Sequence, residues 1–255
     1  MIQCRSIRGI FSVIVIACLM LSGCANKEPK ETAFVLVVFD LSVGAQAVRD
    51  RYLAGFEKIV AALEAGDSVV GDVITETTEK TASFPIDATL PAFNLLEDDE
   101  LGYKARVSKM RKHLQGVAED LLRRKASNSD IMSAFVLAGR AFGCEKAKVA
   151  QRRVFVLFTD GIEQTPELDF TATKDLTDLE IERIIATQRD MGRLPDLSGV
   201  TVYMVGVNAM IDPSADMGHG SMAWVERFWL AYAAATNAEL DKANYSPSLI
   251  NFSVR

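Results

Sequence analysis

Three short apolar runs constrain most strongly how this chain can fold. Phe34–Phe39 and Val154–Phe158 contain no polar residue, and Gly199–Val207 is interrupted only by Thr201 and Tyr203. Uninterrupted apolar runs of this length are typical of strands that are buried on both faces of a parallel sheet. Parallel strands need long crossover connections, so helices are expected between these runs.

The segments between the apolar runs carry apolar residues at helical spacing. Val107, Met110 and Leu114, for example, fall on one stripe of a helix. Ser127–Asp130 precedes another periodic segment and supplies a Ser or Asp for its N-cap. The predicted helices are 45–65, 101–125, a segment from Ile131 to Phe142, 176–191 and 221–236.

Two further segments complete the predicted sheet. Ser68–Thr75 is predicted to be a strand, with Ala82–Ile86 as its hairpin partner. Pro85 places that partner at an edge, because proline cannot donate to a strand ladder. The order of strands and helices predicts an α/β fold: a doubly wound, mostly parallel central sheet with helices on both faces and an antiparallel edge strand.

The first residues have the layout of an export signal. Arg5 and Arg8 precede an apolar run from Ile10 to Met20. That run is too short for a membrane span, which needs roughly 20 residues. Leu21–Cys24 (LSGC) resembles the lipobox of bacterial lipoproteins, whose Cys carries acyl chains such as palmitate and becomes the new N-terminus. An ordinary signal peptide followed by an incidental Cys is the alternative.

The lipobox resemblance implies a domain organisation and a location. We predict a signal peptide over 1–23, a lipidated Cys24 with a short linker over 24–33, and one domain over 34–255. An Asp directly after the lipidated Cys retains lipoproteins in the inner membrane of enteric bacteria, and this chain has Ala25 there. An anchor in the outer membrane, with the domain facing the periplasm, is therefore favoured. The linker reaches roughly 30 Å when extended, so the domain is expected close to the bilayer.

Cysteine and charge counts limit the chemistry further. Cys4 and Cys18 fall in the signal peptide, so no intrachain disulfide is expected once Cys24 is acylated. Cys144 is expected to be a small buried apolar residue near a helix end. The net charge of −6 offers no basic surface for phosphates, so nucleic acid is not expected as a partner.

Three polar clusters fall where a doubly wound sheet binds ligands, beyond the carboxyl ends of its strands. Asp40–Gly44 (DLSVG) follows the first strand, and Ser127–Asp130 precedes a helix. Thr159–Gly161 (TDG) follows the strand that begins at Val154. These clusters are the candidate site.

Together these clusters resemble those of the von Willebrand factor type A (VWA) domain, over roughly Phe34 to Leu240. The resemblance implies a Rossmann-like fold and a metal-ion-dependent adhesion site, in which oxygen atoms from three loops hold a divalent cation. The metal ligands that it implies here are Asp40, Ser42, Ser129 and Asp160, the last often acting through water. Gly44 departs from the family pattern, which places a second Ser there, so a degenerate site is the alternative.

Oxygen ligands suit a hard cation such as Mg²⁺, with Mn²⁺ and Ca²⁺ as further candidates. A cation held in this way keeps a position for an incoming carboxylate, so the expected partner is a protein that offers an acidic side chain. Two other roles for these residues stay open. In the first, Asp40 and Asp160 only cap turns or helices. In the second, the chain is a metal-free scaffold whose partner surface is the acidic loop Glu97–Glu100 or the loop Asp212–Gly220.

No catalytic role is predicted for the site. Asp40 is followed by Ser42 where phosphatases with a nucleophilic Asp carry a second Asp, and Asp40 replaces the first Gly of a hydrolase elbow. His113 is expected on a solvated helix face and His219 in a flexible loop. We therefore expect a lipid-anchored binding protein rather than an enzyme, with an envelope hydrolase as the least favoured reading. The tail 241–255 is assigned no role.

Overall fold

The computed structural model describes residues 31–42, 48–75, 78, 82–94, 96, 98–207, 223–249 and 252–254. These residues belong to one compact unit that spans Thr32–Arg255, apart from Glu31. The predicted signal peptide, Cys24, Gly44, His219 and the loop Asp212–Gly220 lie outside the described residues.

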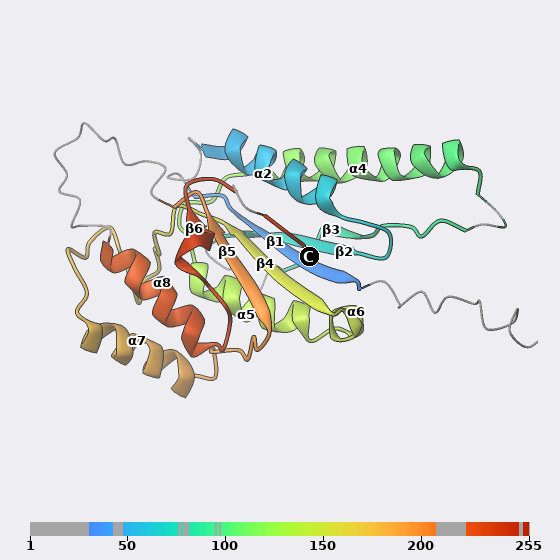
Figure 1. Cartoon of the computed structure of the whole chain (residues 1–255). Coiled ribbons are helices and arrows are strands. Elements are labelled where there is room, and N and C mark those ends of the chain that lie inside the picture. Colours follow the sequence, from blue (N-terminus) through green and yellow to red (C-terminus); the bar gives the residue numbers. More distant parts are fainter. Residues whose placement is uncertain are drawn as a thin grey trace, which may run out of the picture. The chain divides into compact units, whose positions relative to one another are not determined.

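Six strands form one sheet, in the order β3-β2-β1-β4-β5-β6 (Figure 1). Strand β3 is antiparallel to β2, and the other neighbouring strands are parallel. The prediction of a doubly wound, mostly parallel sheet with an antiparallel edge strand is therefore confirmed. The strands are β1 (Ala33–Asp40), β2 (Ser68–Ile74), β3 (Ile86–Thr89), β4 (Arg152–Phe158), β5 (Val200–Val205) and β6 (Tyr245–Ser246).

Strand β1 is central because both of its faces are apolar. All eight of its residues are buried. Phe34, Leu36 and Val38 belong to the core on one side of the sheet, and the alternate residues belong to the core on the other side. Such a run cannot face water on either side, so helices must cover both faces.

Helices α2 and α4 cover one face of the sheet, and α5, α6, α7 and α8 contribute to the core on the other. Figure 1 shows the two layers on opposite sides of the strands. The helices are α2 (Arg49–Ala62), α4 (Glu100–Leu122), α5 (Ile131–Phe142), α6 (Glu145–Val149), α7 (Asp178–Asp190) and α8 (Ala223–Ala235).

Two predicted features of the fold are wrong. Ala82–Ile86 is not the hairpin strand, because β3 begins at Ile86, after Phe84 has turned the backbone with a φ of 47°. Cys144 is exposed rather than buried, since it precedes the short helix α6, which the sequence did not predict. In the part of the chain that the structure describes, no helix is long and apolar enough to span a bilayer.

Candidate functional site

Asp40 ends β1 and brings three loops together. Its carboxylate is fully buried, and Oδ1 accepts a hydrogen bond from the Ser42 backbone N–H at 2.8 Å. Its Oδ2 accepts from the Ser129 hydroxyl at 2.9 Å and from the Thr159 hydroxyl at 2.8 Å. The structure therefore places Asp40, Ser42 and Ser129 in one cluster, and it adds Thr159, which was not among the predicted ligands.

Asp160 lies beside this cluster, directly after Thr159. Its Oδ1 accepts from the Ile162 backbone N–H at 2.9 Å, which fixes a tight turn. Burial, and then the negative charge of Asp40, raise the pKa of Asp160 to about 7. Burial also raises the pKa of Asp40, against the lowering effect of its hydrogen bonds to Ser42, Thr159 and Ser129.

Neither of the two carboxylates forms a direct ion pair with a described residue. The guanidinium of Arg49 acts on Asp40 only through space while it donates to the Leu41 carbonyl at 3.1 Å. Two interacting carboxylates, one buried and one partly buried, disfavour each other's ionised form when no cation pairs with them directly. The site is therefore stabilised by whatever brings positive charge to it, either protons or a cation.

The donor set fits a hard divalent cation in type. It consists of two carboxylates and the hydroxyls of Ser42, Ser129 and Thr159, all oxygen donors. The described residues contain no group of three or more His, Cys, Asp or Glu side chains that could hold a metal. A cation here would therefore depend on hydroxyls and waters for most of its ligands, as Mg²⁺ does in many proteins.

Glu163 connects the loop of Asp160 to the loop of Ser129, and no pattern in the sequence predicts this contact. This side chain is fully buried, and its Oε2 accepts from the backbone N–H groups of Ile131 at 2.9 Å and Met132 at 3.1 Å. The Gln164 N–H also donates to the Ser129 carbonyl at 2.8 Å. The other carboxylate oxygen of Glu163, Oε1, is buried without a hydrogen-bond partner. Burial, and next the charge of Asp130, raise the pKa of Glu163 well above its ordinary value.

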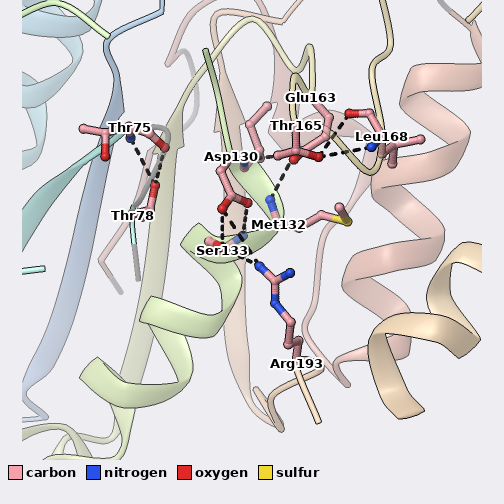
Figure 2. Close-up of polar contacts among 10 residues, drawn as sticks. Thr75, Thr78, Asp130, Met132, Ser133, Glu163, Thr165, Leu168 and Arg193 are labelled. Carbon is pink, nitrogen blue, oxygen red and sulfur yellow. Dashed lines mark hydrogen bonds and ion pairs between the residues drawn. The ribbon is translucent and has the colours of Figure 1, made fainter. Parts of the chain in front are cut away.

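Asp130 is the N-cap of α5, as predicted. Its carboxylate accepts from the Ser133 N–H at 3.0 Å and from the Ser133 hydroxyl at 2.6 Å. Arg193 donates to the same hydroxyl at 2.7 Å. Figure 2 shows Asp130 and Glu163 at the first turn of α5, with Arg193 reaching Ser133 from the opposite side. Two carboxylates thus share the free N–H groups of one helix start, and Asp130 is a cap rather than a metal ligand.

The loop after β4 is also held from α8. The indole N–H of Trp229 donates to the Gly161 carbonyl at 2.8 Å. Gly161 has a φ of 83°, and a Cβ there would lie 3.2 Å from Val207 Cγ1, so a larger residue is excluded on two grounds. The position of Asp160 is therefore set by its neighbours on both sides.

The geometry accounts for only part of the alternative in which Asp40 and Asp160 merely cap turns. Asp40 and Asp160 do accept from the backbone N–H two residues on, as turn-forming aspartates do. This role does not account for the two hydroxyls that converge on Asp40. His113 is exposed on α4, as expected.

No protein-family model and no curated protein matches the sequence. Among solved structures, the chain is similar to the open pilus adhesin SpaC of Lactobacillus rhamnosus GG, with 11% identity over 88% of this chain and 28% of that chain, at a TM-score of 0.44. It is also similar to manganese-loaded TRAP of Plasmodium vivax, with 11% identity over 86% of this chain and 69% of that one, at a TM-score of 0.38.

A third similar structure is a von Willebrand factor type A protein of Catenulispora acidiphila, with 14% identity over 81% of this chain and 43% of that one, at a TM-score of 0.38. The chain thus spans less than a third of SpaC and less than half of the Catenulispora protein. The strand order of the described chain, with an antiparallel edge strand, is that of a doubly wound, Rossmann-like α/β fold. The function of the site has to be argued from the residues of this chain.

Proposed function

We propose that this chain is a lipid-anchored binding protein of the bacterial envelope, without catalytic activity. In this proposal a divalent cation held by Asp40, Ser42, Ser129 and Asp160 binds an acidic side chain of a protein partner. The observation that carries it is the pair of carboxylates, Asp40 buried and Asp160 partly buried, which form no ion pair in the described structure while hydroxyls from two further loops converge on Asp40.

Each residue has a defined part in this function. Asp40 and Asp160 supply the negative charge, and Mg²⁺, Mn²⁺ or Ca²⁺ would replace the protons that their raised pKa values favour. The hydroxyls of Ser129 and Thr159 now donate to Asp40, and rotation of these hydroxyls presents their lone pairs to a cation instead. The bound cation supplies an electrophilic position that a carboxylate of the partner can occupy.

The site lies at the end of the sheet away from the proposed anchor, which supports binding of a partner there. Thr32 donates its N–H to the side chain of Gln151 at 2.8 Å, at the amino end of the sheet. The site lies at the carboxyl end of β1, whose eight residues span about 26 Å. With the anchor at Cys24, the site faces away from the membrane, and an outer-membrane anchor would present it to the periplasm.

The test is a titration of Mg²⁺, Mn²⁺ and Ca²⁺ into the mature chain, followed by calorimetry and thermal unfolding. Saturable stabilisation that grows with metal concentration is expected for the native chain and not for Asp160→Asn. Asp196→Asn is the matched control, because Asp196 accepts from the backbone N–H of Ser198 in the same kind of turn but is exposed. Equal titration curves for the native chain and Asp160→Asn would leave the metal-independent scaffold as the function.

A further inference from the structure

Large apolar side chains are exposed mainly near one end of the domain. The most exposed of those in the described structure are Leu96 at 95% and Leu101 at 80%, and Phe93 follows in the same segment at 41%. Val149 on α6 is exposed at 70%. Exposed apolar residues that occur singly need no explanation, but a cluster of them indicates an interaction surface.

Phe93 and Leu96 belong to the connection from β3 to α4, and Leu101 to the first turn of α4, at the amino end of the sheet. The Tyr103 hydroxyl donates to the Pro91 carbonyl at 3.2 Å, just after the strand β3, whose end pairs with the start of β2. Arg111 donates to the Leu63 carbonyl at 3.0 Å, where α2 ends. The residues of α4 that precede Arg111 extend the helix beyond the end of α2 by roughly 16 Å, at 1.5 Å per residue. Figure 1 shows α4 extending beyond α2 on that side.

The chain enters the described domain at the same end. Thr32 accepts from the backbone N–H of Gln151 at 3.0 Å, and Gln151 comes two residues after the exposed Val149. Thr32 comes eight positions after Cys24, and eight extended residues span at most about 28 Å. A lipid on Cys24 would therefore keep this end of the domain beside the bilayer.

The exposed half of α4 is basic, although the whole chain is acidic. No Asp or Glu occurs between Glu100 and Glu119, a stretch that contains five basic residues. Asp98 and Glu100 at its start are engaged by Arg106 and Lys104. Lys109 and Lys112 are exposed and pair with no described residue. The five basic residues are Lys104, Arg106, Lys109, Arg111 and Lys112.

We propose that the first half of α4, together with Phe93 and Leu96, rests on the anionic headgroups of the membrane that carries the anchor. Leu96 and Leu101 insert at the headgroup boundary, and Lys109 and Lys112 contact lipid phosphates. Apolar and basic side chains side by side are the pattern of a surface that lies in a membrane interface. This inference rests on the proposed lipid anchor, and it assigns the bilayer rather than a protein to this surface.

The experiment uses the mature lipoprotein in vesicles of phosphatidylcholine with about 30% phosphatidylglycerol. An environment-sensitive fluorophore is attached at Leu101→Cys in a Cys144→Ser background, and nitroxide-labelled lipids serve as quenchers. The matched control is Leu179→Cys, because Leu179 is 56% exposed at the start of α7, at the opposite end of the sheet. Both positions are exposed, so neither label disturbs the core.

We expect roughly threefold stronger quenching at position 101 than at position 179, with a blue-shifted emission at position 101. Lys109→Glu with Lys112→Glu should remove most of that difference, and vesicles of phosphatidylcholine alone should do the same. Equal quenching at the two positions would overturn the proposal. So would a blue shift at position 101 that grows with protein concentration and is insensitive to the lipid quencher, because it would assign the surface to a protein partner.

Flotation of the same vesicles separates this inference from the proposed anchor. A chain that floats with the vesicles but shows no quenching at position 101 retains its anchor and refutes the membrane-contacting surface alone. A chain that does not float refutes both the anchor and this surface. Circular dichroism of each labelled variant checks that the fold is unchanged.

Discussion

Two regions of the molecule bury aspartate side chains, and they satisfy them in different ways. Asp67, just before β2, accepts from the backbone N–H groups of Ala33 and Glu64. Asp72, in the middle of β2, accepts from the backbone N–H groups of Val73, Ser83 and Phe84. Asp40 accepts from one backbone N–H and two hydroxyls.

The difference distinguishes carboxylates that only hold the fold from a carboxylate whose hydrogen-bond partners can be given up to a cation. A backbone N–H can only donate and cannot act as a cation ligand. Asp67 and Asp72 therefore hold chain segments in place and are not expected to bind a cation. A hydroxyl can donate or accept, so Ser129 and Thr159 can turn from Asp40 to a cation without any movement of the backbone. The identity of the partners, rather than the burial of the aspartate, thus marks the candidate site.

The largest effect is expected from Asp72→Ala. Three backbone N–H groups would lose their acceptor, at a cost of about 4 kcal/mol in the free energy of unfolding. Chemical denaturation with and without Mg²⁺ measures it, and the loss should be the same in both conditions. If Mg²⁺ restored the stability of this variant, the distinction between Asp72 as a structural aspartate and Asp40 as a metal ligand would be contradicted.

The next largest effect is a gain in stability for Asp160→Asn without metal. The ordinary pKa of 3.8 applies in the unfolded chain, and the folded value of about 7 makes ionisation of Asp160 unfavourable to the fold. The native chain therefore loses stability as pH rises from about 4 to about 7, and the variant avoids this loss. The shift corresponds to ~4 kcal/mol, and partial exposure of the side chain reduces the expected gain to about 3 kcal/mol above pH 7.

Denaturation of both proteins at pH 4.5 and pH 8 measures this gain, which should be small at the lower pH. Divalent metal at pH 8 should reverse the ranking, because it binds the ionised native site. A constant difference between the two proteins at both pH values would contradict the raised pKa of Asp160, which burial and then the charge of Asp40 cause.

Glu163→Ala should cost about 2 kcal/mol, because the first two N–H groups of α5 would lose their acceptor. It should also weaken metal binding, since Glu163 joins the loops that carry Ser129 and Asp160. Glu163→Gln keeps an acceptor oxygen and should stay within about 1 kcal/mol of the native chain with its metal affinity retained. Thermal unfolding with and without metal compares them, and equal metal affinities in all three proteins would assign Glu163 to the fold alone.

The smallest effect on stability is expected for Ser129→Ala, at about 1 kcal/mol. Metal affinity should nevertheless fall by about tenfold or more, because a ligand is lost. Ser68→Ala is the matched control, since its buried hydroxyl bonds to Thr89 at 2.8 Å on the edge of the sheet, among the structural partners. Calorimetric titration should distinguish the two, and similar metal affinities would remove Ser129 from the proposed ligands.

The sequence predicted the features that are local or periodic. The apolar runs at Phe34–Phe39 and Val154–Phe158 became β1 and β4 because a run without polar residues has few other places in a fold. Asp40, Ser42 and Ser129 were predicted to lie together, and the structure brings them together because α5 begins beside the carboxyl end of β1. Asp130 was predicted as a cap from its position alone.

The remaining features depend on contacts that are distant along the chain. Glu163 caps a helix that starts 32 residues earlier, and no local pattern specifies such a partner. The hairpin strand was misplaced because Asp72 holds Ser83 and Phe84 in a turn, which delays β3 until Ile86. Helix α6 has only five residues, too few to show a period, so the exposure of Cys144 at its start was missed.

The hydrogen bond from Trp229 to Gly161 gives the molecule an intrinsic optical signal. The chain has two tryptophans, and the indole of this one is bonded to the carbonyl that directly follows Asp160. The same ring stacks on Phe135 with a centroid separation of 6.0 Å, inside a packed aromatic cluster on α5 and α8. Any event that displaces the loop changes the electric field at this indole, so its emission reports the state of the site in unlabelled protein.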